Sequence, residues 1–239
     1  MTAALDALMQ RAISNPADEP AFLRALLDAE LFVHRPQGDD DDRLRIVQFD
    51  RPDGLQVIPV FTDIHKAYAA SSAAVEIVGL KGHVLFDATR GATFMLNPND
   101  TSCTLYPEEI ADLLSGRPVS RAPVADHIEG VGVEAAEEGD LWIARLVAGA
   151  LEGIEPVTVL YQLKAHVPNG AGQPAVLLVI GVPEQHSERA ARAVSARLEA
   201  NAHRLLCAVD LTHFDPYAPV PDWIEPFAAH PVWRRERIH

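Results

Sequence analysis

Apolar residues recur at helical spacing at the start of the chain. Between residues 2 and 14 they fall three and four positions apart, as on one face of an amphipathic helix: Leu5, Leu8, Met9, Ala12 and Ile13. Pro20 suits the first turn of a second helix, whose apolar side contains Phe22, Leu23, Leu26 and Leu27. The pattern therefore predicts two helices at the beginning of the protein.

Short β-prone runs and turn signals occupy the next part of the chain. An acidic run at 39–42 and a turn signal at 50–54 separate three such runs, which suggests an antiparallel meander over 30–36, 44–49 and 55–61. The following elements are a helix capped by Asp63 over 64–71, strands over 74–80 and 92–97, and a helix over 107–115. Several glycines leave residues 81–91 undecided between helix and strand.

The second half of the chain follows a different pattern. Residues 116–130 contain two prolines and no clear period, so a domain boundary is expected there. Beyond it the predicted elements are a strand near 130–134, a helix over 138–153, strands over 156–167 and 173–182, a helix over 184–202 and a strand over 204–211. This β-α-β-β-α-β order is that of ferredoxin-like domains, in which two helices cover one side of an antiparallel sheet.

These patterns predict an α+β protein with two domains. Residues 1–117 are expected to form N-terminal helices and a mixed or antiparallel sheet, 118–130 a linker, and 131–215 the ferredoxin-like domain. The remaining residues, 216–239, are expected to form a tail rich in aromatic residues and prolines.

Charge and composition narrow the classes of partner. The chain has 20 basic and 34 acidic residues, a formal net charge of −14, and such a field repels phosphate backbones and anionic lipid. The basic cluster at 234–237 contains Glu236 and is interpreted as a solvated tail. The apolar run 175–182 is too short to cross a bilayer, the first residues do not resemble a signal peptide, and Cys103 and Cys207 form no disulfide framework. We expect a cytoplasmic protein without nucleic acid or membrane partners.

Polar and nucleophilic residues gather between an apolar run and a helix. Asn97 precedes a proline, which favours extended geometry, and Asn99 and Asp100 favour turns, so these residues are expected to close a strand. Ser102 or Cys103 would need a base within hydrogen-bond reach to act as a nucleophile, and the neighbouring sequence supplies none. We interpret the segment as structural and assign no catalytic residue, metal or cofactor.

A catalytic alternative rests on a different segment. Asp210, His213 and Asp215 follow a predicted buried strand, and they would orient a water or bind a metal if they converged at the end of the sheet. A metal-assisted or acid/base hydrolase would then be the function. The favoured interpretation of the same residues is an acidic turn ahead of Pro216.

Several segments resemble the N-terminal domain of the SseB family, the enhanced serine sensitivity proteins of bacteria. They are the opening helices, the motif IPVFTD at 58–63, the motif RGATFMLNPND at 90–100 and the acidic helix that ends at Gly116. Residues 131–215 resemble the C-terminal domain of that family more loosely. The resemblance implies a protein named for a serine-sensitivity phenotype, with no established reaction and no catalytic residues to carry over.

The sequence thus favours a binding or regulatory protein over an enzyme. The expected ligand is a protein partner or a small polar metabolite such as an amino acid, and the oligomeric state is left open. Phe61, Thr62 and Asn97 are the candidates for lining a common groove. In the tail, three aromatic residues are candidates for an interface anchor, although cover over the sheet is the preferred interpretation: Trp223, Phe227 and Trp233.

Overall fold

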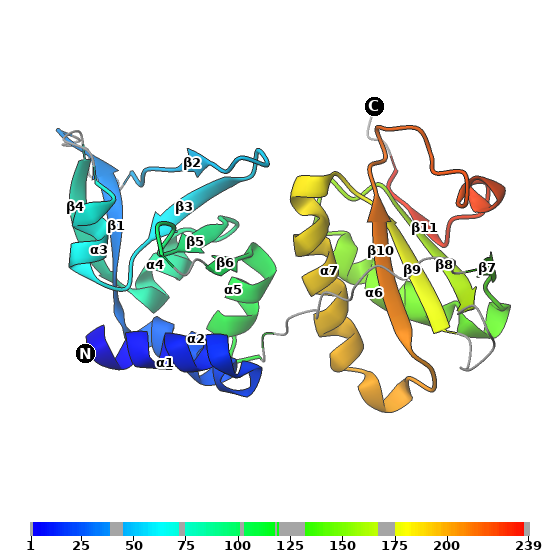
Figure 1. Ribbon diagram of the computed structural model, residues 1–239, viewed down its shortest axis with the longest axis horizontal. Helices are drawn as coiled ribbons and strands as arrows, with labels where there is room; N and C mark the ends of the chain where they lie inside the picture. Colours follow the sequence, from blue (N-terminus) through cyan, green and yellow to red (C-terminus); the bar gives the residue numbers. More distant parts are fainter. Residues whose placement is uncertain are drawn as a thin grey trace. The chain divides into compact units, whose positions relative to one another are not determined.

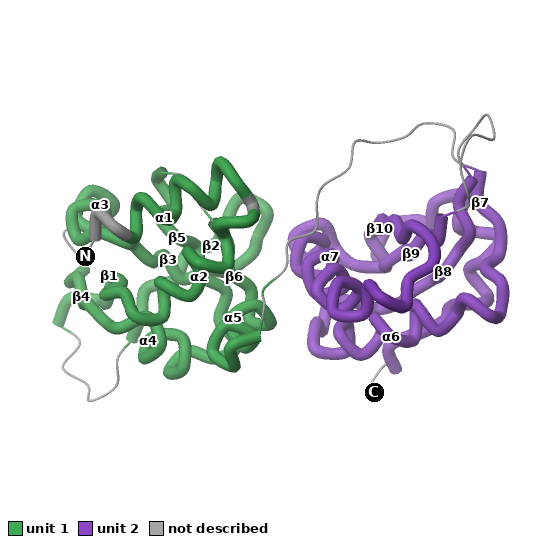
Figure 2. Tube along the Cα trace, turned by 90° about the horizontal axis from the view of Figure 1, so that it is seen from below, with its two compact units in different colours: residues 1–119 green, residues 120–239 purple. Residues whose placement is uncertain are grey.

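The chain folds into two units, Met1–Val119 and Ser120–His239 (Figure 1 and Figure 2). Each unit has its own strands and hydrophobic core. The computed structural model describes residues 2–38, 45–71, 75–100, 103–117, 119, 132–166 and 175–236. Most of the predicted linker 118–130 and the acidic run 39–42 lie outside the described residues. The architecture is α+β, which confirms the fold class expected from the sequence.

The helices of unit 1 lie close to the predicted positions. In chain order they are α1 (Thr2–Ser14), α2 (Glu19–Asp28), α3 (Ile64–Ala69), α4 (Gly82–Ala88) and α5 (Pro107–Leu114). Asp63 caps α3 by accepting a hydrogen bond from the backbone N–H of His65 at 2.7 Å. Residues 81–91, which the sequence left undecided between helix and strand, contain α4, and this helix begins at Gly82. A Cβ atom there would lie 1.9 Å from the carbonyl oxygen of Leu26, so only glycine lets α4 approach α2 this closely.

The strands that the structure describes in unit 1 form two sheets. In chain order they are β1 (Glu30–Pro36), β2 (Phe49–Asp50), β3 (Gln56–Val60), β4 (Val75–Lys81), β5 (Phe94–Leu96) and β6 (Cys103–Leu105). The first sheet is the antiparallel pair β1–β4, and the second has the order β2-β3-β5-β6, in which only β3 and β5 are parallel. The expected antiparallel meander is wrong for β1, which does not pair with the run 44–49. Seven residues of β1 pair with β4 instead, and the run 44–49 forms a strand only at its end.

The core of unit 1 joins its helices to both sheets. Apolar side chains of α1, α2, α4 and α5 pack against inward-facing residues of the strands, which include Leu31, Ile58, Val60, Phe94 and Leu96. Phe32 of β1 also forms an antiparallel bridge with Phe61, directly after β3, so the two sheets are connected by backbone hydrogen bonds. This packing fixes the positions of the ends of β3 and β5.

Unit 2 has the predicted element order but not the ferredoxin-like strand order. Its elements are β7 (Gly132–Ala135), α6 (Trp142–Leu151), β8 (Val159–His166), β9 (Ala175–Gly181), α7 (Glu184–Glu199), β10 (Val209–Phe214) and β11 (Trp233–Arg234). A split βαβ arrangement has a strand between the two strands that a helix connects. Here β9 and β10 are direct parallel neighbours, and β7 and β8 are direct antiparallel neighbours. No strand separates the members of either pair, because β7 and β11 share one edge of β8 and β10 occupies the free edge of β9.

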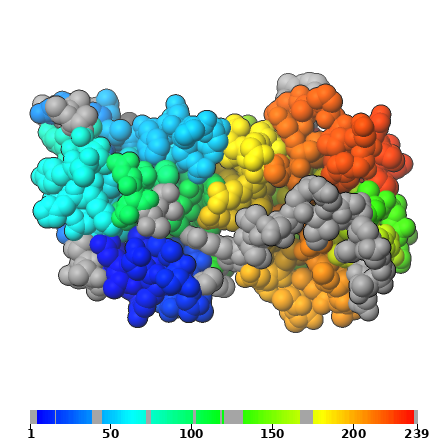
Figure 3. Space-filling model, viewed as in Figure 1, coloured from blue at the N-terminus to red at the C-terminus, as the bar shows by residue number. Residues whose placement is uncertain are grey.

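Both faces of the sheet in unit 2 are covered. On one face, buried residues such as Leu160 and Ile180 pack against α6 and α7, the two helices expected on one side. On the opposite face, Tyr161 and Val179 pack against side chains that follow β10, among them Ile224. Residues 216–236 are therefore a structural part of unit 2, and their orange to red atoms form part of its surface (Figure 3).

Arg235 ties this C-terminal segment to the end of α6. Its guanidinium group donates to four backbone carbonyl oxygens at 2.8 to 3.1 Å: those of Val157, Leu151, Glu152 and Ile154. The last carbonyl groups of a helix have no partner within the helix, and Arg235 gives those of Leu151 and Glu152 a charged donor. The solvated tail expected at 234–237 is therefore wrong for Arg235, while Arg234 is exposed and Arg237 lies outside the described residues.

Replacement of Arg235 by alanine is expected to lower the free energy of unfolding of unit 2 by about 1.5–3 kcal/mol, because backbone carbonyl groups lose charged donors. Urea denaturation of the full chain measures the change. Arg234→Ala is the matched control, since Arg234 makes one long hydrogen bond of 3.5 Å to the Ala228 carbonyl. The control should stay within about 0.5 kcal/mol of the wild type. Equal losses in both variants would contradict the role assigned to Arg235.

Candidate functional site

Residues from the motifs IPVFTD and RGATFMLNPND meet because β3 and β5 are parallel neighbours. Val60 pairs with Leu96 at the carboxyl ends of the two strands, so Thr62 and Asn97 leave the sheet close to each other. The backbone N–H of Asn97 donates to the Val60 carbonyl oxygen at 2.8 Å. Ligands of open α/β sheets bind outside the carboxyl ends of the strands. This end of the β3–β5 pair is therefore the candidate site of unit 1.

Thr62 and Asn97 form a buried hydrogen-bond network. Each residue is only 1% exposed, so unpaired polar atoms would be costly here. The side-chain oxygen of Asn97 accepts from the backbone N–H of Thr62 at 3.1 Å, and its amide nitrogen donates to the Thr62 hydroxyl oxygen at 3.0 Å. That hydroxyl donates to a carboxylate oxygen of Asp6 at 3.0 Å. The network thus joins α1 to the ends of both strands.

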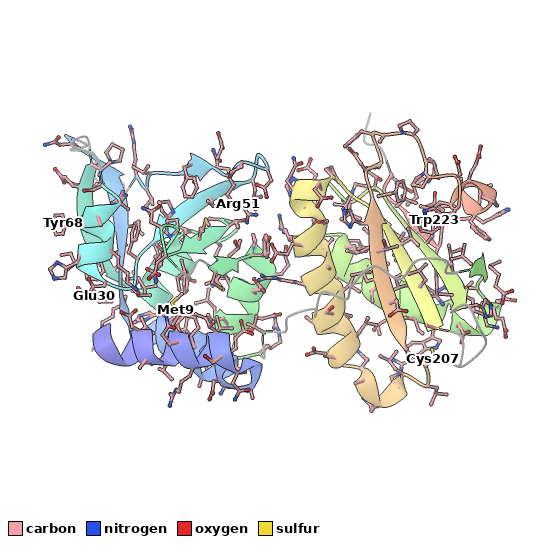
Figure 4. All side chains as sticks on the ribbon, in the orientation of Figure 1. Met9, Glu30, Arg51, Tyr68, Cys207 and Trp223 are labelled. Atoms are coloured by element: carbon pink, nitrogen blue, oxygen red, sulfur yellow. The ribbon has the colours of Figure 1, made fainter. Side chains whose placement is uncertain are left out.

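The backbone of Asn97 is in the left-handed region, with a φ of 45°. The extended geometry expected before Pro98 is therefore wrong. Asparagine tolerates this region better than most residues, and a turn stabilises it, because the Asn97 carbonyl accepts from the backbone N–H of Asp100 at 2.9 Å. The side-chain amide also contacts the sulfur of Met9 at 3.5 Å, and Met9 is a residue of α1 that belongs to the core shared with the strands (Figure 4).

An ion-pair cluster lies next to this network. The ammonium nitrogen of Lys66, on α3, is 3.3 Å from a carboxylate oxygen of Asp6 and 3.2 Å from one of Asp100. Burial acts to lower the pKa of Lys66, but the hydrogen bonds and negative charges of Asp100 and Asp6 outweigh it and raise the pKa above its ordinary value. Lys66 is therefore positively charged at neutral pH, and one ammonium group is shared by two carboxyl groups.

A small open pocket lies beside the cluster. Its volume is about 110 Å³, and it is lined by Phe61, Lys66, Ala69, Asn97, Asn99 and Asp100. Pockets for drug-sized ligands have roughly 300–1,000 Å³. This pocket therefore suits a ligand of a few heavy atoms, or one group of a larger ligand.

Backbone hydrogen bonds and a ring contact hold Phe61 in the wall of the pocket. Its backbone N–H and carbonyl group each form a hydrogen bond of 2.9 Å with Phe32, and its ring centroid lies 5.0 Å from that of His34. His34 is itself buried, and its Nε2 lies 2.9 Å from the carbonyl oxygen of Ala67 on α3. Of the three sequence candidates, Phe61 and Asn97 line the pocket, and Thr62 lies behind it and holds Asn97.

The sequence did not single out the charged residues of this site. Asp6 and Lys66 belong to no recognisable motif, and the sequence around Asp100 indicates only a turn. The sequence did contain one signal for Lys66. This residue lies four positions after Thr62 and one helical turn beyond the Asp63 cap, a spacing that places its side chain near the end of β3 that precedes Thr62.

Asp210, His213 and Asp215 do not converge. Asp210 and His213 are three positions apart on β10 and therefore face opposite sides of the sheet. His213 Nε2 lies 2.8 Å from a carboxylate oxygen of Glu184, and Asp215 closes a turn by accepting from the backbone N–H of Tyr217 at 2.9 Å. Within the described residues, no group of three or more His, Cys, Asp or Glu side chains is suited to hold a metal ion.

The tail aromatics occupy different environments. Phe227 is half-buried against the sheet face that contains Tyr161, and Trp233 is half-buried in β11. Trp223 is 41% exposed on the segment after β10 (Figure 4). Of the two candidate nucleophiles, Cys103 is half-buried in β6 and forms no disulfide bond, and Ser102 lies outside the described residues.

None of the helices in the described ranges is both long enough and apolar enough to cross a membrane. The fold and site define a two-unit α+β protein in which a buried Thr–Asn network joins an N-terminal helix to two parallel strand ends. Residues 1–112, which contain this network, match the family model described as the SseB protein N-terminal domain. This match and the similarity to curated SseB proteins support the SseB family for this chain.

Curated relatives extend the similarity beyond unit 1. The chain is 27% identical over 184 residues to Protein SseB of Escherichia coli (strain K12), which covers 74% of this chain and 71% of that protein. The same values hold for Protein SseB of Shigella flexneri. No solved structure matches the chain.

Substitution of Asn97 separates its side-chain and backbone roles. Asn97→Ala is expected to lower the free energy of unfolding by about 2–4 kcal/mol, because it removes buried hydrogen bonds and places a Cβ-bearing residue without side-chain support in the left-handed region. Asn97→Gly removes the same hydrogen bonds but tolerates the positive φ, so it should be about 1 kcal/mol more stable than Asn97→Ala. Urea denaturation gives both values, and equal stability of the two variants would refute the backbone argument.

Lys66→Met removes the ammonium group and keeps most of the apolar stem. Because the pKa of Lys66 is raised in the folded protein, the stabilisation by the charged form is fully present below the unfolded-state pKa and is lost as pH rises above the ordinary value of 10.5. The difference in unfolding free energy between wild type and Lys66→Met should therefore be constant near neutral pH and shrink at alkaline pH. Urea denaturation over a pH series measures it. A difference that stays unchanged through the alkaline range would contradict the assigned ion pairs.

Proposed function

We propose that this protein is a non-enzymatic binding or regulatory protein, and that unit 1 binds a small polar metabolite in the pocket beside Lys66. The observation that carries the proposal is the coincidence of the pocket with the ends of β3 and β5. Phe61 and Asn97, which the family motifs contain, line a pocket whose other walls are Lys66, Ala69, Asn99 and Asp100.

The chemistry of the walls supports binding over catalysis. The Thr62 hydroxyl and the Asn97 amide are engaged with each other and with Asp6, so they hold the backbone in place. Lys66 remains charged at neutral pH because its two carboxylate partners raise its pKa, so it suits a fixed positive charge better than a proton acceptor. Polar groups that are held in place, together with one positive charge, are suited to recognise a ligand by hydrogen bonds and charge.

The same proposal covers the partners that the protein does not use, its cellular location and its biological role. The formal charge of −14 supports a protein that does not use nucleic acid or anionic lipid surfaces as partners. The proposal includes the cytoplasmic location expected from the sequence and the link to serine sensitivity that the resemblance to the SseB family implies, with an amino acid as the first metabolite to test.

A protein partner is the second candidate, and a different surface favours it. Tyr217, Val220 and Trp223 are all exposed large apolar side chains on the segment that follows β10, with Tyr217 77% exposed. Aromatic residues of this kind are enriched at the centres of protein interfaces. Co-purification of one partner with the full chain, lost in Trp223→Ala, would favour this candidate.

A ligand screen tests the metabolite proposal. Thermal unfolding of the full chain is measured with amino acids, small amines, sugars and nucleotides, and a ligand present at about 100 times its dissociation constant adds about 2.7 kcal/mol to stability. Ala69→Leu fills the pocket with a larger side chain and should abolish the shift. Ala200→Leu, at an exposed position after α7, is the matched control and should keep it. If no compound shifts the transition, or if Ala69→Leu shifts as the wild type does, the proposed site is wrong.

A further inference from the structure

The pocket beside Lys66 has an apolar interior although most of the residues around it are polar. The polar residues of its lining are Lys66, Asn97, Asn99 and Asp100. The surface that the lining presents to the interior is nevertheless almost wholly apolar, so these residues contribute mainly carbon atoms, alongside Phe61 and Ala69. A ligand group that enters the pocket therefore meets carbon atoms.

The polar ends of Lys66 and Asn97 are engaged with neighbouring residues. The ammonium nitrogen of Lys66 lies 3.3 Å from a carboxylate oxygen of Asp6 and 3.2 Å from one of Asp100. The side-chain oxygen of Asn97 accepts from the backbone N–H of Thr62, and its amide nitrogen donates to the Thr62 hydroxyl. A hydroxyl or amide group that entered the pocket would have to break one of these contacts or lose its hydrogen bonds to water, and both cost free energy.

The size of the pocket limits the group that it takes. Phe61 is only 1% exposed, and its backbone N–H and carbonyl group are both bonded to Phe32, so the pocket is closed on that side. An enclosed apolar cavity of about 150 Å³ holds one benzene molecule. By the same ratio, the volume of about 110 Å³ has room for at most about four carbon atoms.

The charges next to the pocket disfavour a ligand with a net negative charge. Asp6 and Asp100 supply two carboxyl groups to the one ammonium group of Lys66. The Asp100 side chain is 54% exposed, whereas the Lys66 side chain is 30% exposed. A net anion would be repelled by this cluster, while a zwitterion has no net charge and avoids most of the repulsion. The polar part of the ligand is therefore expected to be neutral overall.

We propose that the pocket receives the short aliphatic side chain of a small amino acid, while the α-ammonium and α-carboxylate groups remain at the opening in contact with water. The side chain contacts Phe61, Ala69 and the carbon atoms of the polar lining residues. This inference rests on the proposed binding site and names the class of ligand that the site takes: amino acids with about two or three apolar side-chain carbons.

A series of amino acids with a constant head group tests this inference: glycine, L-alanine, L-2-aminobutyrate, L-norvaline and L-phenylalanine. Backbone amide NMR shifts of the full chain, followed at residues 61–69 and 97–100, give the dissociation constant of each. From glycine to L-norvaline the affinity is expected to rise by about two- to fourfold for each added carbon, because each one buries apolar surface. L-Phenylalanine is too large for the pocket and should bind no more tightly than glycine.

L-Serine is the matched control for L-2-aminobutyrate, since a hydroxyl group replaces the terminal methyl group and the number of heavy atoms is the same. Its hydroxyl group would leave water for an apolar interior. L-Serine should therefore bind at least about fivefold more weakly than L-2-aminobutyrate.

Two substitutions of Ala69 change the size of the pocket in opposite directions. Ala69→Leu fills the pocket and should remove the difference between glycine and L-norvaline. Ala69→Gly removes one methyl group from the wall, so the best-binding member of the series should become one carbon longer, with L-norleucine added as a probe. Ala200→Gly, at an exposed position after α7, is the matched control and should leave the order of affinities unchanged.

The outcomes separate this inference from the function on which it rests. Equal affinities from glycine to L-norvaline, with shifts at 61–69 and 97–100, would overturn the aliphatic inference and leave the pocket as a binding site for the head group. L-Serine binding as tightly as L-2-aminobutyrate would overturn it as well. If none of the amino acids produces shifts at these residues, both the aliphatic inference and the proposed site are wrong.

Discussion

The parallel pairing of β3 with β5 is the constraint on which the site depends. Because Val60 and Leu96 are paired, the two chains leave the sheet at the same level, and Asn97 reaches both the backbone and the hydroxyl group of Thr62. Burial makes this arrangement nearly obligatory, since a buried polar group without a partner costs about 1–3 kcal/mol. The Thr62 hydroxyl in turn donates to Asp6, which connects α1 to this network.

The charged cluster extends the same logic to the surface. Asp6 serves Thr62 and Lys66 at once, and Asp100 holds Lys66 from the turn that Asn97 begins. Three segments far apart in the sequence are thereby connected through one ammonium group. Because these charges are only partly shielded, their value lies less in stability than in the electrostatic character that they give to the opening of the pocket.

Local signals in the sequence identified elements more successfully than their partners. The apolar period of residues 2–14, the Asp63 cap and the acidic start of the helix at Pro107 act within one or two turns, and the corresponding helices are present. Strand pairing is decided by residues distant in sequence. β1 pairs with β4 because its alternative partner, the run 44–49, forms a much shorter strand. β7 and β11 share one edge of β8 because the other edge of β8 is already paired with β9.

The candidate site was also predictable only in part. Phe61, Thr62 and Asn97 were identified from motifs, and the parallel strands do bring them together. The ion pairs were not predictable, because Asp6, Lys66 and Asp100 lie on three separate elements and become neighbours only through tertiary packing. The function of Arg235 was hidden for a similar reason, since its acceptors are carbonyl groups, which leave no mark in the sequence.

The shared edge of β8 has a consequence for the order in which the protein assembles during translation. The last strand described in unit 1 is complete once Leu105 has left the ribosome, and α5 follows directly, so this half is able to close early. In unit 2, the first residues of β8 wait for Trp233 and Arg234, and the carbonyl groups after α6 wait for Arg235. Until those residues emerge, part of that sheet edge is open, which makes the nascent second half the stage at which chaperone contact is most useful.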